Sequence, residues 1–339
     1  MAPDPGDPRL RPHRSGTVAH SRALTIAATI LAVATGCDKL KETVTGRPST
    51  STPIVESLDL STTPDILFQV FGERANPQIL PLAALIEGAV RPIELSPDGW
   101  RRFADIYQKK GTQYRVYDDG RDIGSITVRQ GMWEKPGAPV YSLPNCAALL
   151  PLATVKLETR IDVGFTVELL GTSARIGTPR PAANMSQADV RRIGREMGSL
   201  VADGQEIPRR ALDALDFRAY AVNTGATPRP TIIASFIDRQ GGEGEDGRTE
   251  GHVFVIADVG PDGGYTPTFS HAFRGSTQNA EYRIYLNHID LTGDRVHEIV
   301  VEGRLTAGGS YIGILGHENG GWREIFRSRS GWCLDSEGE

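Results

Sequence analysis

The sequence predicts an α+β fold made mainly of antiparallel strands, with a helix-bearing N-terminal region and a C-terminal β-meander of two blade-like units. The 38 glycines and 22 prolines among 339 residues predict many turns and short elements. Short apolar runs between turn residues recur along the chain, whereas two segments carry start and stop signals for helices. A Pro- and Gly-rich stretch at 177–183 is the predicted boundary between an α+β domain at 63–180 and a β-rich domain at 181–339.

The strands of the first domain are predicted from short apolar or alternating runs bounded by turn residues. Two of these runs flank Asp119-Gly120, and an Asp-Gly pair between two strands is typical of a tight hairpin turn. The predicted strands cover residues 66–71, 79–87, 89–95, 114–118, 124–128, 154–161 and 164–170.

The first predicted helix begins at Ser96. Serine is a favoured N-cap residue, and a proline and an aspartate follow it at positions where helices accept them. Gly111 is expected to end the helix. Aromatic residues spaced three and four apart predict a core-facing stripe, which consists of Trp100, Phe103 and Tyr107.

The second predicted helix begins at Ser186. Asp189 lies three residues further on, so the pair forms a variant of the capping box with aspartate in place of glutamate. Gly204 is expected to end this helix. Its predicted apolar face consists of Val190, Ile193, Met197 and Leu200.

The N-terminal region has the features of a secretory signal. An apolar run at 23–36 follows Arg14 and Arg22 and ends directly on Cys37, which is the order of a positive flank, an apolar core and small residues before a cleavage site. The run is shorter than the roughly 20 residues that a membrane-spanning helix needs. Its end, Val-Ala-Thr-Gly-Cys, resembles a bacterial lipobox. An ordinary signal peptide with an incidental Cys37, or a buried core helix, are the alternatives.

The resemblance to bacterial lipoproteins implies an exported, lipid-anchored protein. Residues 1–36, read from Met1 or from Val18, would be the signal peptide, and Cys37 would carry the acyl chains that hold the protein to a lipid bilayer. The polar residues at 37–62 are predicted to form a flexible tether, because they bury little apolar surface. The sequence leaves open whether the inner or the outer membrane receives the anchor.

The other two cysteines are Cys146 and Cys333. An exported compartment permits disulfides, and lipidation of Cys37 leaves an even number of thiols. The sequence therefore predicts a disulfide between Cys146 and Cys333. Two buried free thiols are the alternative, since free cysteine packs as a small hydrophobic residue.

The last hundred residues resemble two copies of one β-unit, spaced by roughly 50 residues, as in repeat architectures. The copies share a run ending in aspartate, an apolar strand and a Gly-Gly-aromatic turn. The first copy contains 234–238, 252–257, 263–265 and 272–275, and the second contains 286–290, 311–315, 320–322 and 328–331.

The second copy contains a loop that resembles the calcium loops of FG-GAP and VCBS repeats. Calcium binds six to eight hard oxygen atoms, and side chains at alternating loop positions can converge on such an ion. The resemblance implies a Ca²⁺ site with Asp290, Thr292, Asp294, the carbonyl of Val296 and Glu298 as ligands. A metal-free turn, in which aspartate and glycine set the backbone conformation, is the alternative. The corresponding segment of the first copy, 241–247, is expected to be a solvated acidic loop.

The formal net charge of −5 and the absence of a basic stripe do not favour nucleic acid as a partner. The sequence contains no nucleophile elbow, phosphate-binding loop or zinc-protease helix. It therefore favours a binding or structural module of the cell envelope, with an envelope protein or a glycan as ligand, over an enzyme. The histidines fall singly on predicted strands and turns, which predicts partly exposed side chains rather than a zinc site.

An envelope hydrolase that uses two carboxylates far apart in the sequence is the alternative function. Its candidate residues are aspartates at predicted strand ends, and nothing in the sequence distinguishes them from ordinary turn residues. They are Asp118, Asp119, Asp122, Asp238 and Asp258.

Overall fold

The computed structural model describes residues 58–131, 152–174, 176, 179–238, 249–276, 280–305 and 309–328. Residues 54–339 belong to one compact unit. The predicted signal peptide, Cys37, most of the tether, Cys146 and Cys333 lie outside the described residues. Within the described residues, no helix has the length and apolar character needed to cross a bilayer.

The first half of the compact unit is a closed antiparallel barrel. Strand β1 pairs with both β2 and β7, so the order β1-β7-β4-β5-β6-β2 returns to its start, and β3 extends the sheet beyond the ring. The strands are β1 (Asp65–Glu73), β2 (Gln78–Ile86), β3 (Ala89–Arg91), β4 (Gln113–Asp118), β5 (Arg121–Gln130), β6 (Ala153–Thr159) and β7 (Thr166–Thr172). A short 3-10 helix, η1 (Leu60–Thr62), precedes them at the end of the predicted tether, and Leu60 is buried.

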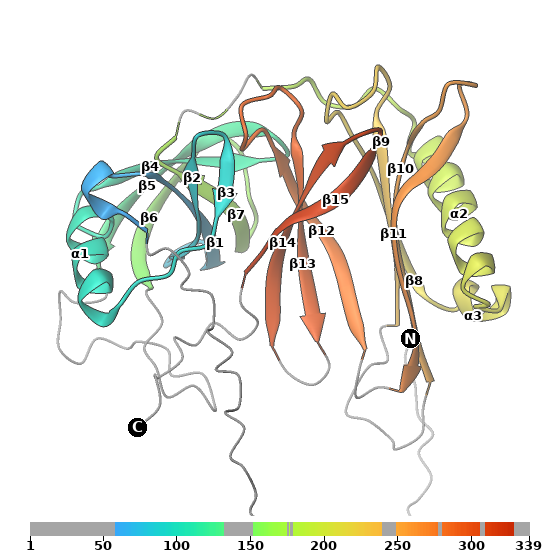
Figure 1. Cartoon of the computed structure of the whole chain (residues 1–339), viewed down its shortest axis with the longest axis horizontal. Coiled ribbons are helices and arrows are strands. Elements are labelled where there is room, and N and C mark those ends of the chain that lie inside the picture. The colour runs from blue at the N-terminus through green and yellow to red at the C-terminus, as the bar shows by residue number, and fades with distance from the viewer. Residues whose placement is uncertain are drawn as a thin grey trace, which may run out of the picture. The chain divides into compact units, whose positions relative to one another are not determined.

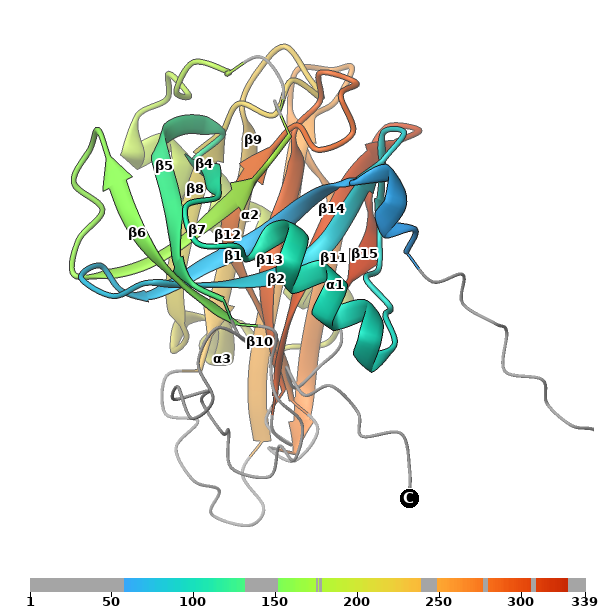
Figure 2. The ribbon, with the colours of Figure 1, turned by 90° about the vertical axis from the view of Figure 1, so that its left-hand side faces the viewer.

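Helix α1 (Pro97–Tyr107) packs on the barrel core (Figure 2). Ser96 caps it as predicted, because its hydroxyl accepts a hydrogen bond from the Gly99 amide at 3.1 Å. The predicted aromatic face is buried in the same core as the inward-facing strand residues, and the rings of Phe68 and Tyr114 lie 4.7 Å apart there. The helix ends at Tyr107, before Gly111, which lies in the following turn with a φ of 90°.

The second half contains two four-stranded antiparallel meanders, which confirm the predicted α+β class dominated by antiparallel strands. We call them the outer sheet and the central sheet. The outer sheet consists of β8 (Asp216–Val222), β9 (Thr231–Ile237), β10 (Thr249–Val259) and β11 (Tyr265–Ser276). The central sheet consists of β12 (Glu281–Ile289), β13 (Glu298–Leu305), β14 (Ser310–Glu318) and β15 (Gly321–Arg327).

The strand order corrects half of the predicted repeat alignment. The hairpins β10–β11 and β14–β15 occupy equivalent places in their sheets, as the two Gly-Gly-aromatic turns predict. The run at 234–238 lies largely in β9, the second strand of its sheet, whereas 286–290 lies largely in β12, the first strand of the other. The loop after Asp290 therefore corresponds to the β8–β9 loop, not to 241–247, which lies outside the described residues.

The sheets are stacked in layers that share hydrophobic cores (Figure 1). One core joins the barrel to the central sheet and contains Leu67, Leu170, Val300 and Ile314 among others. A second core joins the central sheet to the outer sheet. A third joins the outer sheet to α2 (Gln187–Gly204), with α3 (Arg209–Asp213) beside it. The central sheet is consequently buried on both faces.

Helix α2 begins at the predicted cap and ends at the predicted glycine. The Ser186 hydroxyl accepts from the Asp189 amide at 3.1 Å and donates to the Asp189 carboxylate at 2.6 Å. The prediction for Leu200 was wrong, because its side chain is 54% exposed. The buried stripe is completed by Gly194, Gly198 and Ala202, whose small size lets the helix approach the outer sheet closely.

Candidate ligand-binding pocket

The β4–β5 turn places an aspartate at the junction of the sheets. Asp119 and Gly120 form the two-residue loop of the predicted hairpin, with φ angles of 46° and 68°, which is the backbone of a type I′ turn. A Cβ atom on Gly120 would lie 2.8 Å from Nδ1 of His297 and 3.1 Å from Nε2 of His288. The turn therefore rests directly on two histidines of the central sheet and its β12–β13 loop.

A chain of hydrogen bonds holds the Asp119 carboxylate. The Tyr285 hydroxyl donates to Oδ1 of Asp119 at 3.0 Å, and Nδ1 of His288 lies 2.7 Å from the same hydroxyl. Because the phenol has only one hydrogen, which it gives to Asp119, Nδ1 of His288 must carry the proton that it donates to Tyr285. The network thus assigns the His288 tautomer and leaves Nε2 with the lone pair.

Burial sets the protonation states of this chain. It raises the pKa of Tyr285 well above its usual value, and the neighbouring Asp119 raises it further. It also lowers the pKa of His288 to about 4, with His297 contributing in the same direction. At neutral pH, Tyr285 is therefore protonated and His288 is neutral. The Asp119 side chain itself is 56% exposed.

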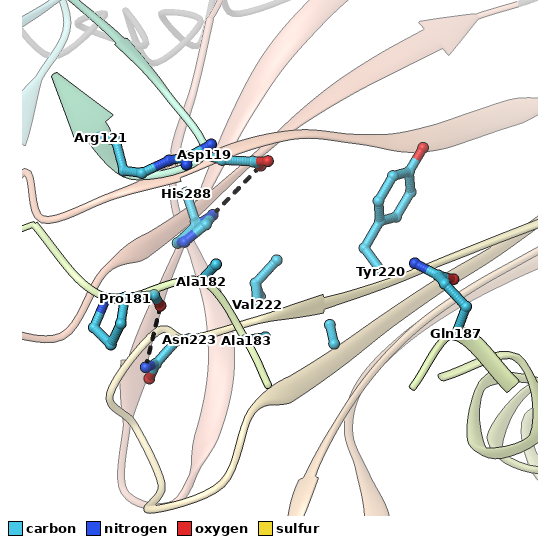
Figure 3. A pocket seen from close by; sticks show the side chains of 11 residues that line it. Asp119, Arg121, Pro181, Ala182, Ala183, Gln187, Tyr220, Val222, Asn223 and His288 are labelled. Atoms are coloured by element: carbon cyan, nitrogen blue, oxygen red, sulfur yellow. Dashed lines mark hydrogen bonds and ion pairs between the residues drawn. The ribbon is translucent and has the colours of Figure 1, made fainter. Parts of the chain in front are cut away.

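Asp119 faces a pocket of about 230 Å³ at which the barrel, both meanders and the linker before α2 meet. Figure 3 shows Asp119 and His288 on one side of it and Tyr220 and Gln187 on the other. The lining residues are Asp119, Arg121, Pro181, Ala182, Ala183, Gln187, Tyr220, Ala221, Val222, Asn223 and His288.

The structure brings one of the five candidate aspartates into this pocket. Asp118 directly precedes Asp119, and burial raises the pKa of Asp118. Asp122 forms ion pairs with Arg115 and Arg160. Asp258 is buried elsewhere and accepts hydrogen bonds from Thr231, Thr268 and Trp322, the groups that compensate for its desolvation. Asp238 follows β9 and does not line the pocket.

The predicted exposure of the histidines was wrong for three of them. The exposed fractions of His252, His288 and His297 are 0%, 5% and 2%. Each lies where two layers of the fold meet. The pattern of a single strand does not show which layers will pack against it. Apolar runs such as Ile299–Val301, which are typical of strands covered on both faces, are the signal that points to such burial.

The predicted calcium ligands lie in the β12–β13 loop and at the start of β13. Their carboxylates accept hydrogen bonds from groups of the loop itself. Asp290 accepts from the Gly293 amide at 2.7 Å, and Glu298 accepts from the Leu291 amide at 2.6 Å and the Thr292 hydroxyl at 2.8 Å. The remaining carboxylate, Asp294, accepts from the Val296 amide at 2.7 Å.

Burial raises the pKa of Glu298 to about 7. Among the described residues, no group of three or more His, Cys, Asp or Glu is arranged to hold a metal ion. The donor types suit calcium, but the loop would have to rearrange so that they converge. Calcium binding stays a prediction.

Comparison of the chain with models of known families, with curated proteins and with solved structures gave no match.

Proposed function

We propose that this protein is a lipid-anchored binding module of the cell envelope, and that the pocket beside Asp119 is its ligand site. The lipobox-like sequence ending at Cys37 supports the anchor. The pocket supports the binding role, because the hydrogen bonds of the Tyr285 hydroxyl fix Asp119 and His288 before any ligand arrives, and preorganisation lowers the entropic cost of binding.

The observation that carries the binding role is the fixed position of Asp119. Its backbone occupies the left-handed turn conformation, and its side chain accepts from the buried hydroxyl of Tyr285. The Asp119 side chain is half-exposed, and a carboxylate without a fixed partner would reorient freely in water. Here the hydrogen bond from Tyr285 orients the carboxylate, which presents its other lone pairs to the pocket. Such an arrangement selects ligands by hydrogen bonding.

The lining chemistry favours binding over hydrolysis. Among the described residues that line the pocket, Asp119 is the acidic one, and none is a serine, threonine, cysteine or lysine. A hydrolase with a carboxylate pair needs a second carboxylate within roughly 5–9.5 Å of the first, across the substrate. The partner in this pocket is instead the neutral imidazole of His288, which is bonded to Tyr285.

The anchor is tested by metabolic labelling of the full chain with an alkyne-tagged fatty acid in a bacterial host. We expect the wild type to be labelled and to fractionate with membranes, and Cys37→Ser to lose both properties. Cys146→Ser is the matched control and should be labelled normally. Unlabelled wild-type protein in the soluble fraction would contradict the proposal.

A further inference from the structure

The pocket carries two opposite charges on one turn. Asp119 lies within the β4–β5 loop, and Arg121 begins β5 two residues later. The two formal charges cancel, so the described lining residues offer no net attraction for a simple anion or cation. What remains is a set of groups that both accept and donate hydrogen bonds: the amides of Gln187 and Asn223 and the hydroxyl of Tyr220.

The Asp119 carboxylate has bonding capacity left for a ligand. An ionised carboxylate offers about four acceptor sites, and within the described part of the chain its hydrogen-bond donor is the hydroxyl of Tyr285. In Figure 3 the carboxylate points toward the side of the pocket on which Tyr220 lies. Two neighbouring hydroxyl groups on a ring are spaced so that both can donate hydrogen bonds to one carboxylate.

An aromatic ring supplies the apolar part of the lining. The ring of Tyr220 lies 4.9 Å from that of Tyr285, which fixes its position. A tyrosine presents an apolar face together with a polar tip, which suits a ligand with C–H groups on one face and hydroxyls at its rim. Val222 and Ala182 add further apolar contacts.

The volume limits the size of the ligand. At about 230 Å³, the pocket is smaller than the roughly 300–1,000 Å³ of sites for drug-sized molecules. It accommodates one ring rather than several.

We propose that the pocket binds one residue of an uncharged sugar, with Asp119 accepting hydrogen bonds from its hydroxyls and Tyr220 packing against its face. This inference rests on the proposed binding function and names its ligand class. A zwitterionic amino acid would use Asp119 and Arg121 as separate charge partners, and is an alternative outcome of the same test.

The test is saturation-transfer NMR on the full chain in detergent, with glucose, galactose and N-acetylglucosamine as probes and glycine and inorganic phosphate as charged comparisons. We expect at least one sugar to bind, and its affinity to fall roughly tenfold or more in Asp119→Asn, because a hydrogen bond to a charged group is lost. Asparagine tolerates the left-handed backbone and still accepts from Tyr285, so this variant should fold. Asp162→Asn, at an exposed aspartate outside the pocket, is the matched control.

The outcomes separate the two proposals. Binding of glycine or phosphate that depends on Asp119, without sugar binding, would overturn the sugar class and keep the pocket as a ligand site. The absence of any probe whose binding depends on Asp119 would overturn both the sugar class and the role of the pocket. The fatty-acid labelling of Cys37 decides the anchor independently.

Discussion

The Tyr285 hydroxyl donates a hydrogen bond to Asp119 over 3.0 Å and thereby ties the central sheet to the β4–β5 turn of the barrel. The two residues are far apart in the sequence, and Tyr285 is buried in the core between the central and outer sheets. The same hydroxyl accepts from His288. One buried phenol thus positions the carboxylate of the pocket and fixes a neighbouring imidazole.

We predict that Tyr285→Phe lowers the free energy of unfolding by about 1–3 kcal/mol, because the buried Nδ1–H of His288 loses its acceptor. Urea denaturation measures the change. Tyr265→Phe is the comparison, since it removes the hydroxyl's hydrogen bonds with the Pro230 carbonyl and with Arg229 at a half-buried position, and should cost less because no buried donor loses its acceptor. An equal or larger loss in Tyr265→Phe would contradict the assigned network.

Position 120 requires glycine for two reasons: the backbone has a positive φ, and a Cβ atom would contact His297. We predict that Gly120→Ala destabilises the protein by about 1–2 kcal/mol for the left-handed conformation, and by a further amount for the contact of the new Cβ with His297 at 2.8 Å. Gly263→Ala isolates the first contribution, because Gly263 has a φ of 82° and nothing within 4 Å of the Cβ position. Thermal denaturation of both variants gives the difference. Equal losses would show that the turn does not rest on the histidines.

Local signals predicted the elements that local contacts determine. The N-caps at Ser96 and Ser186 and the Asp-Gly hairpin each depend on a few neighbouring residues, and all three are confirmed. The closure of the barrel depends on the pairing of β1 with both β2 and β7. The β1–β7 pairing joins residues about a hundred positions apart, and nothing in the periodicity of the strands specifies it.

The candidate site could be predicted only in part for the same reason. Asp119 was one of five aspartates at predicted strand ends, and the sequence could not rank them. Its distinguishing feature is the stacking of the barrel on the central sheet, which places Tyr285 and His288 against it. Leu200 shows the opposite error, since an apolar residue at nearly the right helical spacing lies one position away from the buried stripe.

Calcium binding by the β12–β13 loop is tested by melting the full chain with calcium and with chelator. We predict a higher melting temperature in calcium, which Asp290→Asn should abolish. Asp262→Asn is the matched control. Asp262 accepts from the amide of Gly264 in another turn, as Asp290 accepts from the amide of Gly293. No calcium-dependent shift in the wild type would reduce the loop to a metal-free turn closed by its own hydrogen bonds.

We expect the buried His252 to make the protein less stable in acid. Its Nδ1 donates to the Phe236 carbonyl at 2.8 Å, and its Nε2 accepts from the Arg283 amide at 2.9 Å. The ring therefore joins β9, β10 and β12 in its neutral form. Burial lowers the pKa of His252 to about 3, and His271 and Arg283 act in the same direction, while the hydrogen bond to the Phe236 carbonyl and the charge of Glu281 oppose them.

The sign of the pH dependence follows from the lowered pKa. Between about pH 6.5, where the unfolded histidine titrates, and about pH 3, the unfolded chain binds a proton that the folded chain does not. The stability that depends on neutral His252 is therefore fully present above pH 6.5. It falls as the pH drops, by at most about 1.4 kcal/mol per pH unit.

We predict that His252→Gln, whose amide keeps one donor and one acceptor, reduces the difference in unfolding free energy between pH 7 and pH 5 by about 2 kcal/mol. The variant will be less stable than the wild type at pH 7, because glutamine does not reproduce the ring geometry, so the pH difference and not the absolute stability is the measured quantity. Urea denaturation at the two pH values supplies it. His317→Gln, at a half-buried position beside Trp322, controls for the substitution itself. A pH difference in His252→Gln equal to that of the wild type would place the acid sensitivity elsewhere in the molecule.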